Sequence, residues 1–188
     1  MFFHETVILD QALNQHIVFR HIFLNMFAVW MFGRIMEVQW GSKRFLIFYL
    51  LCGIGAGAMQ ELCQFVHYGL VYSHYEVVAV GNGMTIPMMQ YLDRILTVGA
   101  SGSVYGILLG YGMTFPNNQL FIIPFPFPIK AKWLVVGYII LELGLGIRGS
   151  AADNVAHFAH LGGMLTGFLI LLYWKHKERK DNHIKFTW

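Results

Sequence analysis

The chain has 188 residues, of which 56% are hydrophobic and only 12% are charged, and its formal net charge is +3 at pH 7. This charged share is about half of that found in a typical soluble globular domain. The composition therefore excludes an ordinary soluble fold and indicates a membrane protein.

Five apolar stretches account for this composition, at about residues 22–39, 45–67, 98–115, 133–149 and 155–174. Each approaches the length that an α-helix, rising about 1.5 Å per residue, needs to cross about 30 Å of hydrocarbon. The short alternating segments of a membrane β-barrel do not occur in the sequence. We therefore expect a single all-α membrane domain, a polytopic bundle of five transmembrane helices.

The positive-inside rule orients these five spans. One side of the membrane would hold only Arg20, Arg94 and Arg148. The opposite, cytoplasmic side would hold the other ten basic residues, Arg34, Lys43, Arg44, Lys130, Lys132, Lys175, Lys177, Arg179, Lys180 and Lys185. Residues 176–188 then form a basic cytoplasmic tail, typical of the flank of a membrane span and not of a nucleic-acid-binding segment. The polar residues 1–16 lack the basic and apolar regions of a signal peptide.

Polar side chains occur at a similar depth in three of the predicted spans. The first span carries His21 and Asn25, which lie four residues apart and so share one helical face. The third span begins at Gly99-Ala100-Ser101-Gly102, and the fifth carries His157 and His160 near its outer end. Polar groups inside a membrane span are costly and indicate function, so we expect these side chains to meet.

Glycines repeat every fourth residue in the same spans. Gly102, Gly106 and Gly110 form such a face in the third span, and Gly163 and Gly167 form one in the fifth. Small residues let membrane helices approach closely, and a close approach of these two spans would bring the serine and the histidine within hydrogen-bonding reach.

These residues suit nucleophilic catalysis by serine, although a serine in a membrane helix often only packs or bonds to its own backbone. A neutral histidine can take the proton of a serine hydroxyl, and His21, Asn25 and the backbone N–H of Ser101 could stabilise the resulting oxyanion. Metalloprotease chemistry would need a His-Glu-x-x-His motif, and aspartyl chemistry would need two aspartates inside spans; the sequence has neither. The soluble Gly-x-Ser-x-Gly elbow is also absent, because position 103 is serine. A Ser–His dyad without metal or cofactor remains.

Three motifs in this order resemble the rhomboid family of intramembrane serine proteases. They are His-x-x-x-Asn at 21–25, Gly-x-Ser-Gly at 99–102, and Ala-His-x-x-Gly-x-x-x-Gly at 159–167. The resemblance covers residues 17–175 and implies a rhomboid-type helical bundle. It implies Ser101 as nucleophile, His160 as base, and His21 and Asn25 as oxyanion donors. Tyr105 lies where the family often places an aromatic ring against the catalytic histidine.

The same resemblance implies a transmembrane protein substrate, cleaved near the outer face of the lipid bilayer. We expect a multi-pass protein of a bacterial inner membrane, with no nucleic-acid partner. For His157 we expect a packing or hydrogen-bonding role beside the site, and for Glu61 and Glu142 structural pairing or contact with water.

The sequence departs from the family in one respect: residues 1–16 are too few and too polar for the first of the usual six helices, so we expect that helix to be missing before His21. Two alternatives therefore stay open: an inactive truncated protease, and a non-catalytic rhomboid-like module that binds transmembrane clients. A small transporter or channel would show internal repeats, which the sequence does not contain.

Overall fold

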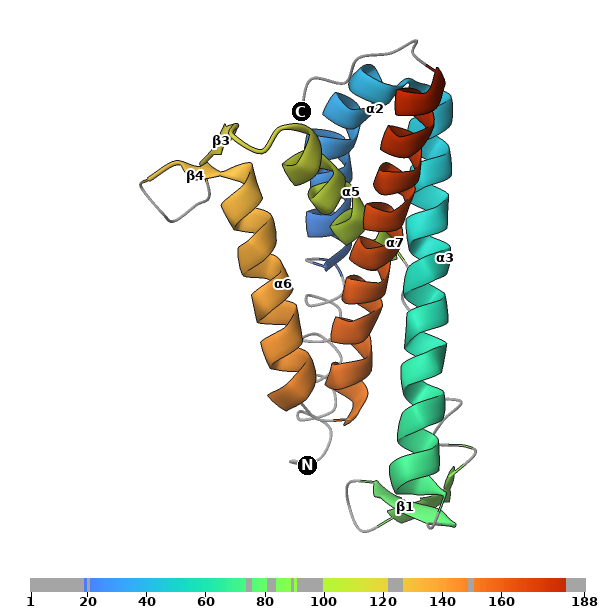
Figure 1. Ribbon diagram of the computed structural model, residues 1–188. Coiled ribbons are helices and arrows are strands. Elements are labelled where there is room, and N and C mark those ends of the chain that lie inside the picture. The colour runs from blue at the N-terminus through green and yellow to red at the C-terminus, as the bar shows by residue number, and fades with distance from the viewer. Residues whose placement is uncertain are drawn as a thin grey trace.

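The computed structural model describes residues 19, 21–73, 76–80, 84–88, 90, 100–121, 127–148 and 151–181. Its long helices are α3 (Ser42–His67), α5 (Ala100–Thr114), α6 (Ala131–Arg148) and α7 (Ala151–Asp181), arranged as a bundle (Figure 1). A helical stretch at residues 21–28 continues through the π-helical turn η1 (Val29–Gly33) into α2 (Arg34–Trp40). Each of the five predicted spans is therefore occupied by a helix, and the all-α class is confirmed.

Two short antiparallel strand pairs accompany the helices. After α3 and the π-helical turn η2 (Tyr68–Tyr72), β1 (Val77–Val80) pairs with β2 (Met84–Pro87). Between α5 and α6, β3 (Gln119–Leu120) pairs with β4 (Ile129–Lys130). The sequence analysis predicted neither pair. Both lie in connections at the ends of the bundle (Figure 1), where β-branched residues favour local pairing.

The chain reverses direction between α2 and α3 at Gly41. This residue has a φ of +84°, a backbone conformation that favours glycine. Its N–H donates to the carbonyl oxygen of Glu37 at 2.8 Å, and its own carbonyl oxygen accepts from the N–H of Phe45 at 3.0 Å. One glycine thus ends the first helical segment and starts the next at the same end of the bundle.

Helix α5 occupies the centre of the bundle and contacts α3, α6, α7 and η1 (Figure 1). It contains no charged residue, and most of its side chains are buried. Its glycines allow this burial, because a Cβ on Gly106 would lie 2.5 Å from Cys52 Sγ and one on Gly110 would lie 2.9 Å from the Trp40 ring. With 15 residues, α5 is only about 22 Å long, so its N-terminus begins inside the bundle.

An aromatic cluster closes the end of the bundle where α2, α3 and α7 meet. The Trp40 ring packs edge-on against Phe48 and Trp174, with centroids 4.9 and 5.5 Å away. The Arg44 guanidinium lies 5.7 Å from the centroid of Trp174 and donates to Glu178 Oε1 at 3.0 Å. Helix α7 continues to Asp181, so the first residues of the predicted basic tail are helical.

Replacing Arg44 by alanine removes both of these contacts. Arg44 is 41% exposed, and exposed pairs of this kind contribute about 0.2–1 kcal/mol, so we expect a small loss of thermal stability in detergent. Lys43→Ala, at an exposed neighbouring position, is the matched control and leaves the unfolding temperature unchanged. A loss of several kcal/mol in Arg44→Ala would contradict this account.

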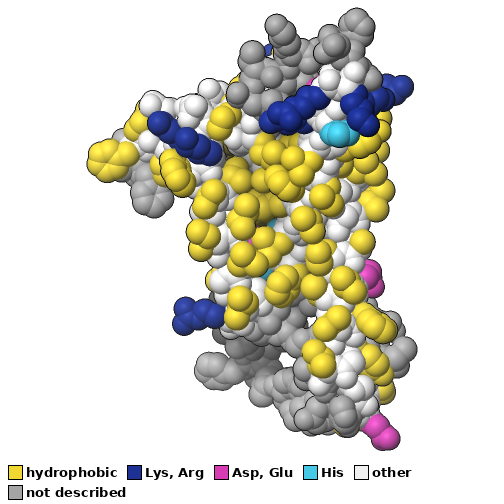
Figure 2. Space-filling view, in the orientation of Figure 1, with side chains coloured by type: hydrophobic (Ala, Val, Ile, Leu, Met, Phe, Trp, Pro, Cys, Tyr) yellow, Lys and Arg dark blue, Asp and Glu magenta, His cyan; other side chains and the backbone are white. Residues whose placement is uncertain are grey.

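Two helices, Ser42–Leu70 and Ala156–Lys180, are long and apolar enough to cross a membrane, among the residues described. Large apolar side chains such as Trp30, Ile54 and Phe168 are exposed on the outside of the bundle. Figure 2 shows apolar side chains over the middle of the molecule and most of the visible Lys and Arg at the end that holds α2. This distribution fits a bilayer around the bundle, and the five-span topology stays a prediction.

Candidate active site

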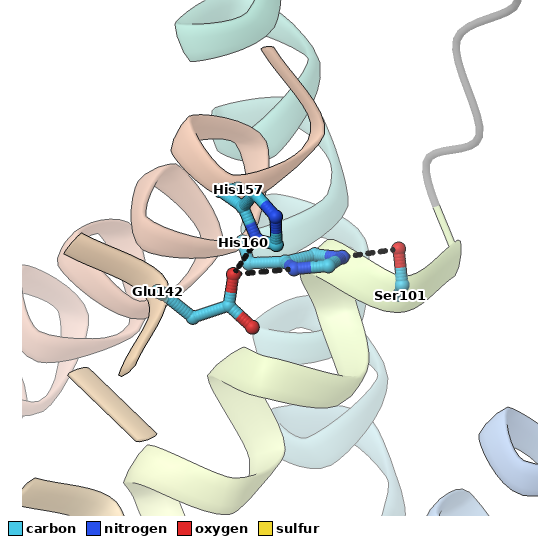
Figure 3. Close-up of polar contacts among 4 residues, drawn as sticks. All are labelled: Ser101, Glu142, His157 and His160. Carbon is cyan, nitrogen blue, oxygen red and sulfur yellow. Dashed lines mark hydrogen bonds and ion pairs between the residues drawn. The ribbon is translucent and has the colours of Figure 1, made fainter. Parts of the chain in front are cut away.

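Ser101 and His160 come together across the interface between α5 and α7. Ser101 is in the first turn of α5 and is 4% exposed. His160 is in the N-terminal half of α7, with its side chain 15% exposed. His160 Nε2 lies 3.0 Å from Ser101 Oγ, although 59 residues separate them along the chain (Figure 3). A serine hydroxyl thus faces a histidine nitrogen in the protein interior.

Glycines make this approach possible. A Cβ on Gly163 would overlap the carbonyl oxygen of Gly102, so the backbones of α7 and α5 touch one turn from the dyad. On its other side, Gly102 faces Ala56 of α3, whose side chain a Cβ would overlap. Gly167 of α7 faces α3 instead, since a Cβ there would lie 2.9 Å from the Phe48 ring. Of the predicted glycine faces, Gly102 and Gly163 therefore form the close contact between α5 and α7, whereas Gly106, Gly110 and Gly167 mainly face side chains of α2 and α3. Gly99 lies outside the described residues.

Tyr105 covers one face of the histidine. Its ring stacks on that of His160 with centroids 4.2 Å apart and an angle of 14° between the planes. The Tyr138 ring of α6 packs edge-on against the Tyr105 ring, with ring centroids 5.8 Å apart, and restricts the movement of Tyr105. Since Tyr105 is one turn after Ser101, the same helix carries the serine and a ring that restrains the orientation of His160.

The Glu142 carboxylate lies on the opposite side of His160 from Ser101. Its side chain is 3% exposed, and Oε2 lies 3.1 Å from His160 Nδ1 and 2.6 Å from His157 Nδ1 (Figure 3). The sequence analysis expected Glu142 to be paired but did not identify the partners. A usable signal was present, because Glu142 is the one charged residue between Trp133 and Ile147.

Glu142, His157 and His160 are also the described residues that could hold a metal ion, since their ligand atoms lie within 4.8 Å of one another. An ion bound at about 2.0–2.2 Å from each ligand would hold an oxygen and a nitrogen more than about 3 Å apart in tetrahedral geometry. The 2.6 Å between Glu142 and His157 is too short for that and fits a direct hydrogen bond. The geometry favours a hydrogen-bonded cluster over a metal centre.

His21 and Asn25 lie on the helical stretch 21–28. The His21 side chain is exposed and that of Asn25 is half-buried. The structure brings Ser101, His160 and Tyr105 into contact, and the role of His21 and Asn25 as oxyanion donors stays a prediction.

A separate apolar cavity of about 790 Å³ lies between α6 and α7. Its walls include Val135, Ile139 and Leu143 of α6 and Leu161 and Leu165 of α7, and neither member of the dyad lines it. Because its walls are almost entirely apolar and hold neither Ser101 nor His160, this cavity is not the candidate active site.

Comparisons with known proteins match most of the chain. The family model of the Rhomboid domain matches residues 11–177. RHOMBOID-like protein 4 of Arabidopsis thaliana is 27% identical over 150 residues, which cover 80% of this chain and 29% of the relative. Rhomboid protease GluP of Bacillus subtilis (strain 168) is 29% identical over 155 residues, covering 81% of this chain and 23% of the relative.

Rhomboid protein 1, mitochondrial, of Saccharomyces cerevisiae is 26% identical over 155 residues, covering 82% of this chain and 38% of the relative. The chain thus matches well under half of the length of each of these relatives. No solved structure gives a significant match.

Proposed function

We propose that this chain, which belongs to the rhomboid family, is an intramembrane serine endopeptidase with Ser101 as nucleophile and His160 as general base. The observation that carries the proposal is the 3.0 Å contact between Ser101 Oγ and His160 Nε2 in the interior of the bundle. A serine hydroxyl is a weak nucleophile until a neighbouring base takes its proton, and His160 is placed for that transfer.

The proposed reaction has two halves. Ser101 Oγ bonds to the carbonyl carbon of the substrate while its proton moves to His160 Nε2. The tetrahedral intermediate collapses, the carbon–nitrogen bond breaks, and His160 gives the proton to the leaving amine. Water then attacks the acyl ester, His160 takes a proton from it, and that proton returns to Ser101 Oγ as the ester bond breaks. The stacked Tyr105 ring restrains His160 throughout.

The proposed substrate is a transmembrane protein, and the cut lies near the outer membrane face. A hydrogen-bonded helix hides its carbonyl carbons from a nucleophile, so the substrate helix must unwind before it is cut. Ser101 begins a short helix inside the bundle, and the basic side chains gather at the opposite end of that helix (Figures 1 and 2). With this basic end in the cytoplasm, as the positive-inside rule favours, the dyad faces the outer side of a bacterial inner membrane and the C-terminus is cytoplasmic.

A reporter protein in proteoliposomes tests the proposal. Its transmembrane helix carries glycine and proline near the outer end, so that it unwinds there, and mass spectrometry of the products locates the cut. We expect one cut within the outer part of the helix. A folded protein that binds the reporter without cutting it would contradict the proposal and favour a client-binding module.

Asn25→Ala tests the proposed oxyanion donor. Loss of one donor costs about 10²–10³-fold in kcat in a soluble serine protease, and for this half-buried donor we expect a loss of about 10- to 1000-fold, with KM little changed. Leu24→Ala, at an exposed neighbouring position, is the control and keeps the full rate of reporter cleavage. An unchanged kcat in Asn25→Ala would remove Asn25 from the oxyanion site.

A further inference from the structure

We propose that Glu142 is a positioning residue that fixes the tautomer of His160, so that Ser101, His160 and Glu142 act as a triad. This inference rests on the proposed protease function and adds to the dyad a third residue, from α6. The contact that carries it is the 3.1 Å separation between Glu142 Oε2 and His160 Nδ1, on the side of the ring away from Ser101 (Figure 3).

Hydrogen-bond chemistry assigns the ring nitrogens. An ionised carboxylate only accepts hydrogen bonds, so a histidine nitrogen bonded to it must carry a proton. His160 therefore holds its proton on Nδ1 when it is neutral, which leaves the lone pair of Nε2 directed at the Ser101 hydroxyl. This is the tautomer that a general base needs, because the other tautomer would present an N–H to the serine.

The carboxylate has a second use once the proton has moved. When His160 takes the serine proton it becomes a cation inside the bundle, and a carboxylate 3.1 Å away stabilises that cation. The titratable side chains that face the His160 ring in the described part of the chain are Ser101, Tyr105, Glu142 and His157. Among these side chains, Glu142 carries the carboxylate, which can balance the positive charge of protonated His160.

His157 makes the buried carboxylate tolerable. A buried carboxylate is costly unless it is hydrogen-bonded on several sides. His157 Nδ1 donates to Glu142 Oε2 at 2.6 Å, and the Tyr105 side chain also interacts with this carboxylate. We therefore assign His157 to the support of Glu142, because its Nδ1 is engaged by the carboxylate and Ser101 is paired with His160.

A merely structural role for Glu142 would be to tie α6 to α7. Any side chain at position 142 that holds α6 against α7 would fulfil that structural role, whether or not it is charged. A positioning role depends on the charge and on the acceptor character of the carboxylate. The substitution Glu142→Gln separates the two roles, since glutamine keeps the size of the side chain but loses the charge and can donate to His160 Nδ1.

The experiment uses the full chain in liposomes with ¹⁵N-labelled histidine. The nitrogen signals of His160 are identified by their loss in His160→Asn and report which ring nitrogen carries the proton. We expect the Nδ1–H form in the unmodified chain and in Glu142→Asp, and a shift toward the Nε2–H form in Glu142→Gln. Glu61→Gln, the same change at an exposed position on α3, is the control and leaves the His160 signals unchanged.

Kinetics on the reporter give the second readout. Loss of the carboxylate in other serine triads costs about 10⁴-fold in kcat. We expect kcat to fall by up to about 10⁴-fold in Glu142→Gln, while KM stays within about threefold. Glu142→Asp keeps the charge and recovers part of kcat. A folded Glu142→Gln protein with unchanged kcat and an unchanged His160 tautomer would overturn the inference.

Failure of the inference and failure of the proposed function give different results. An unmodified, folded chain that neither cuts the reporter nor reacts with a fluorophosphonate contradicts the protease function, and its nitrogen signals still decide whether Glu142 sets the tautomer. If Glu142→Gln does not fold, Glu142→Met, which also removes the acceptor, decides instead. An unchanged Nδ1–H form in the folded methionine variant would overturn the inference.

Discussion

Replacing Ser101 by alanine is expected to abolish cleavage of the transmembrane reporter, and replacing His160 by alanine is expected to lower kcat by about 10⁴-fold or more. The two residues act as a unit, because the Ser101 hydroxyl is a weak nucleophile without a base, and His160 has no serine proton to accept once Ser101 is replaced. The double variant should therefore be no slower than either single variant. Reporter cleavage in proteoliposomes gives the rates.

Ser103→Ala is the matched control for this pair. Ser103 is buried on the same helix, two residues after Ser101, and its hydroxyl donates to the carbonyl oxygen of Tyr49 at 2.9 Å. Removing that hydroxyl costs about one hydrogen bond of stability but leaves the reacting groups intact. Loss of cleavage in Ser103→Ala, or full cleavage in Ser101→Ala, would show that the nucleophile has been assigned to the wrong residue.

Replacing Gly163 by alanine is expected to separate α5 from α7 and to slow cleavage of the reporter. The new Cβ would overlap the carbonyl oxygen of Gly102, a backbone atom that cannot rotate away. Overpacking of this kind costs about 1–3 kcal/mol, and a shift of about 1 Å between reacting groups can cost about 10²-fold in rate. We expect a lower unfolding temperature in detergent together with a fall in kcat of about that size.

Gly57→Ala is the control for Gly163→Ala. Gly57 lies within α3, and a Cβ there would meet no atom within 4 Å, so alanine should be neutral or slightly stabilising. Equal losses of rate in Gly57→Ala and Gly163→Ala would show that the loss comes from replacing any helix glycine, and not from the contact between Gly163 and Gly102.

Much of the fold could be predicted from the sequence because its strongest signal is local. Long apolar runs form helices wherever the backbone must satisfy its own hydrogen bonds, and all five predicted stretches contain helices. The strand pairs β1–β2 and β3–β4 were missed because short connections carry no long-range periodicity. The extension of α7 past Trp174 was also missed, because these residues lie beyond the apolar run; Glu178 in this extension pairs with Arg44, a residue 134 positions away.

The site was predictable to a similar extent. The glycines that repeat every fourth residue from Gly102 and from Gly163 indicated that the two spans pack closely. Ser101 and His160 lie one turn or less from the contact between Gly102 and Gly163. The partners of Glu142 were not predictable, because they depend on how α6 is rotated against α7. That rotation is set by side-chain packing across the whole interface and not by any local motif.

The most direct test of the account is labelling of the purified, detergent-solubilised protein with a fluorescent fluorophosphonate, followed by mass spectrometry of the modified peptide. A fluorophosphonate reacts preferentially with a serine that a neighbouring base has activated. The account predicts one modification, on Ser101, that disappears in Ser101→Ala and in His160→Ala, while size-exclusion chromatography shows all three proteins folded. The account would be contradicted if the folded protein without any substitution stayed unlabelled, or if the label were found on any other serine.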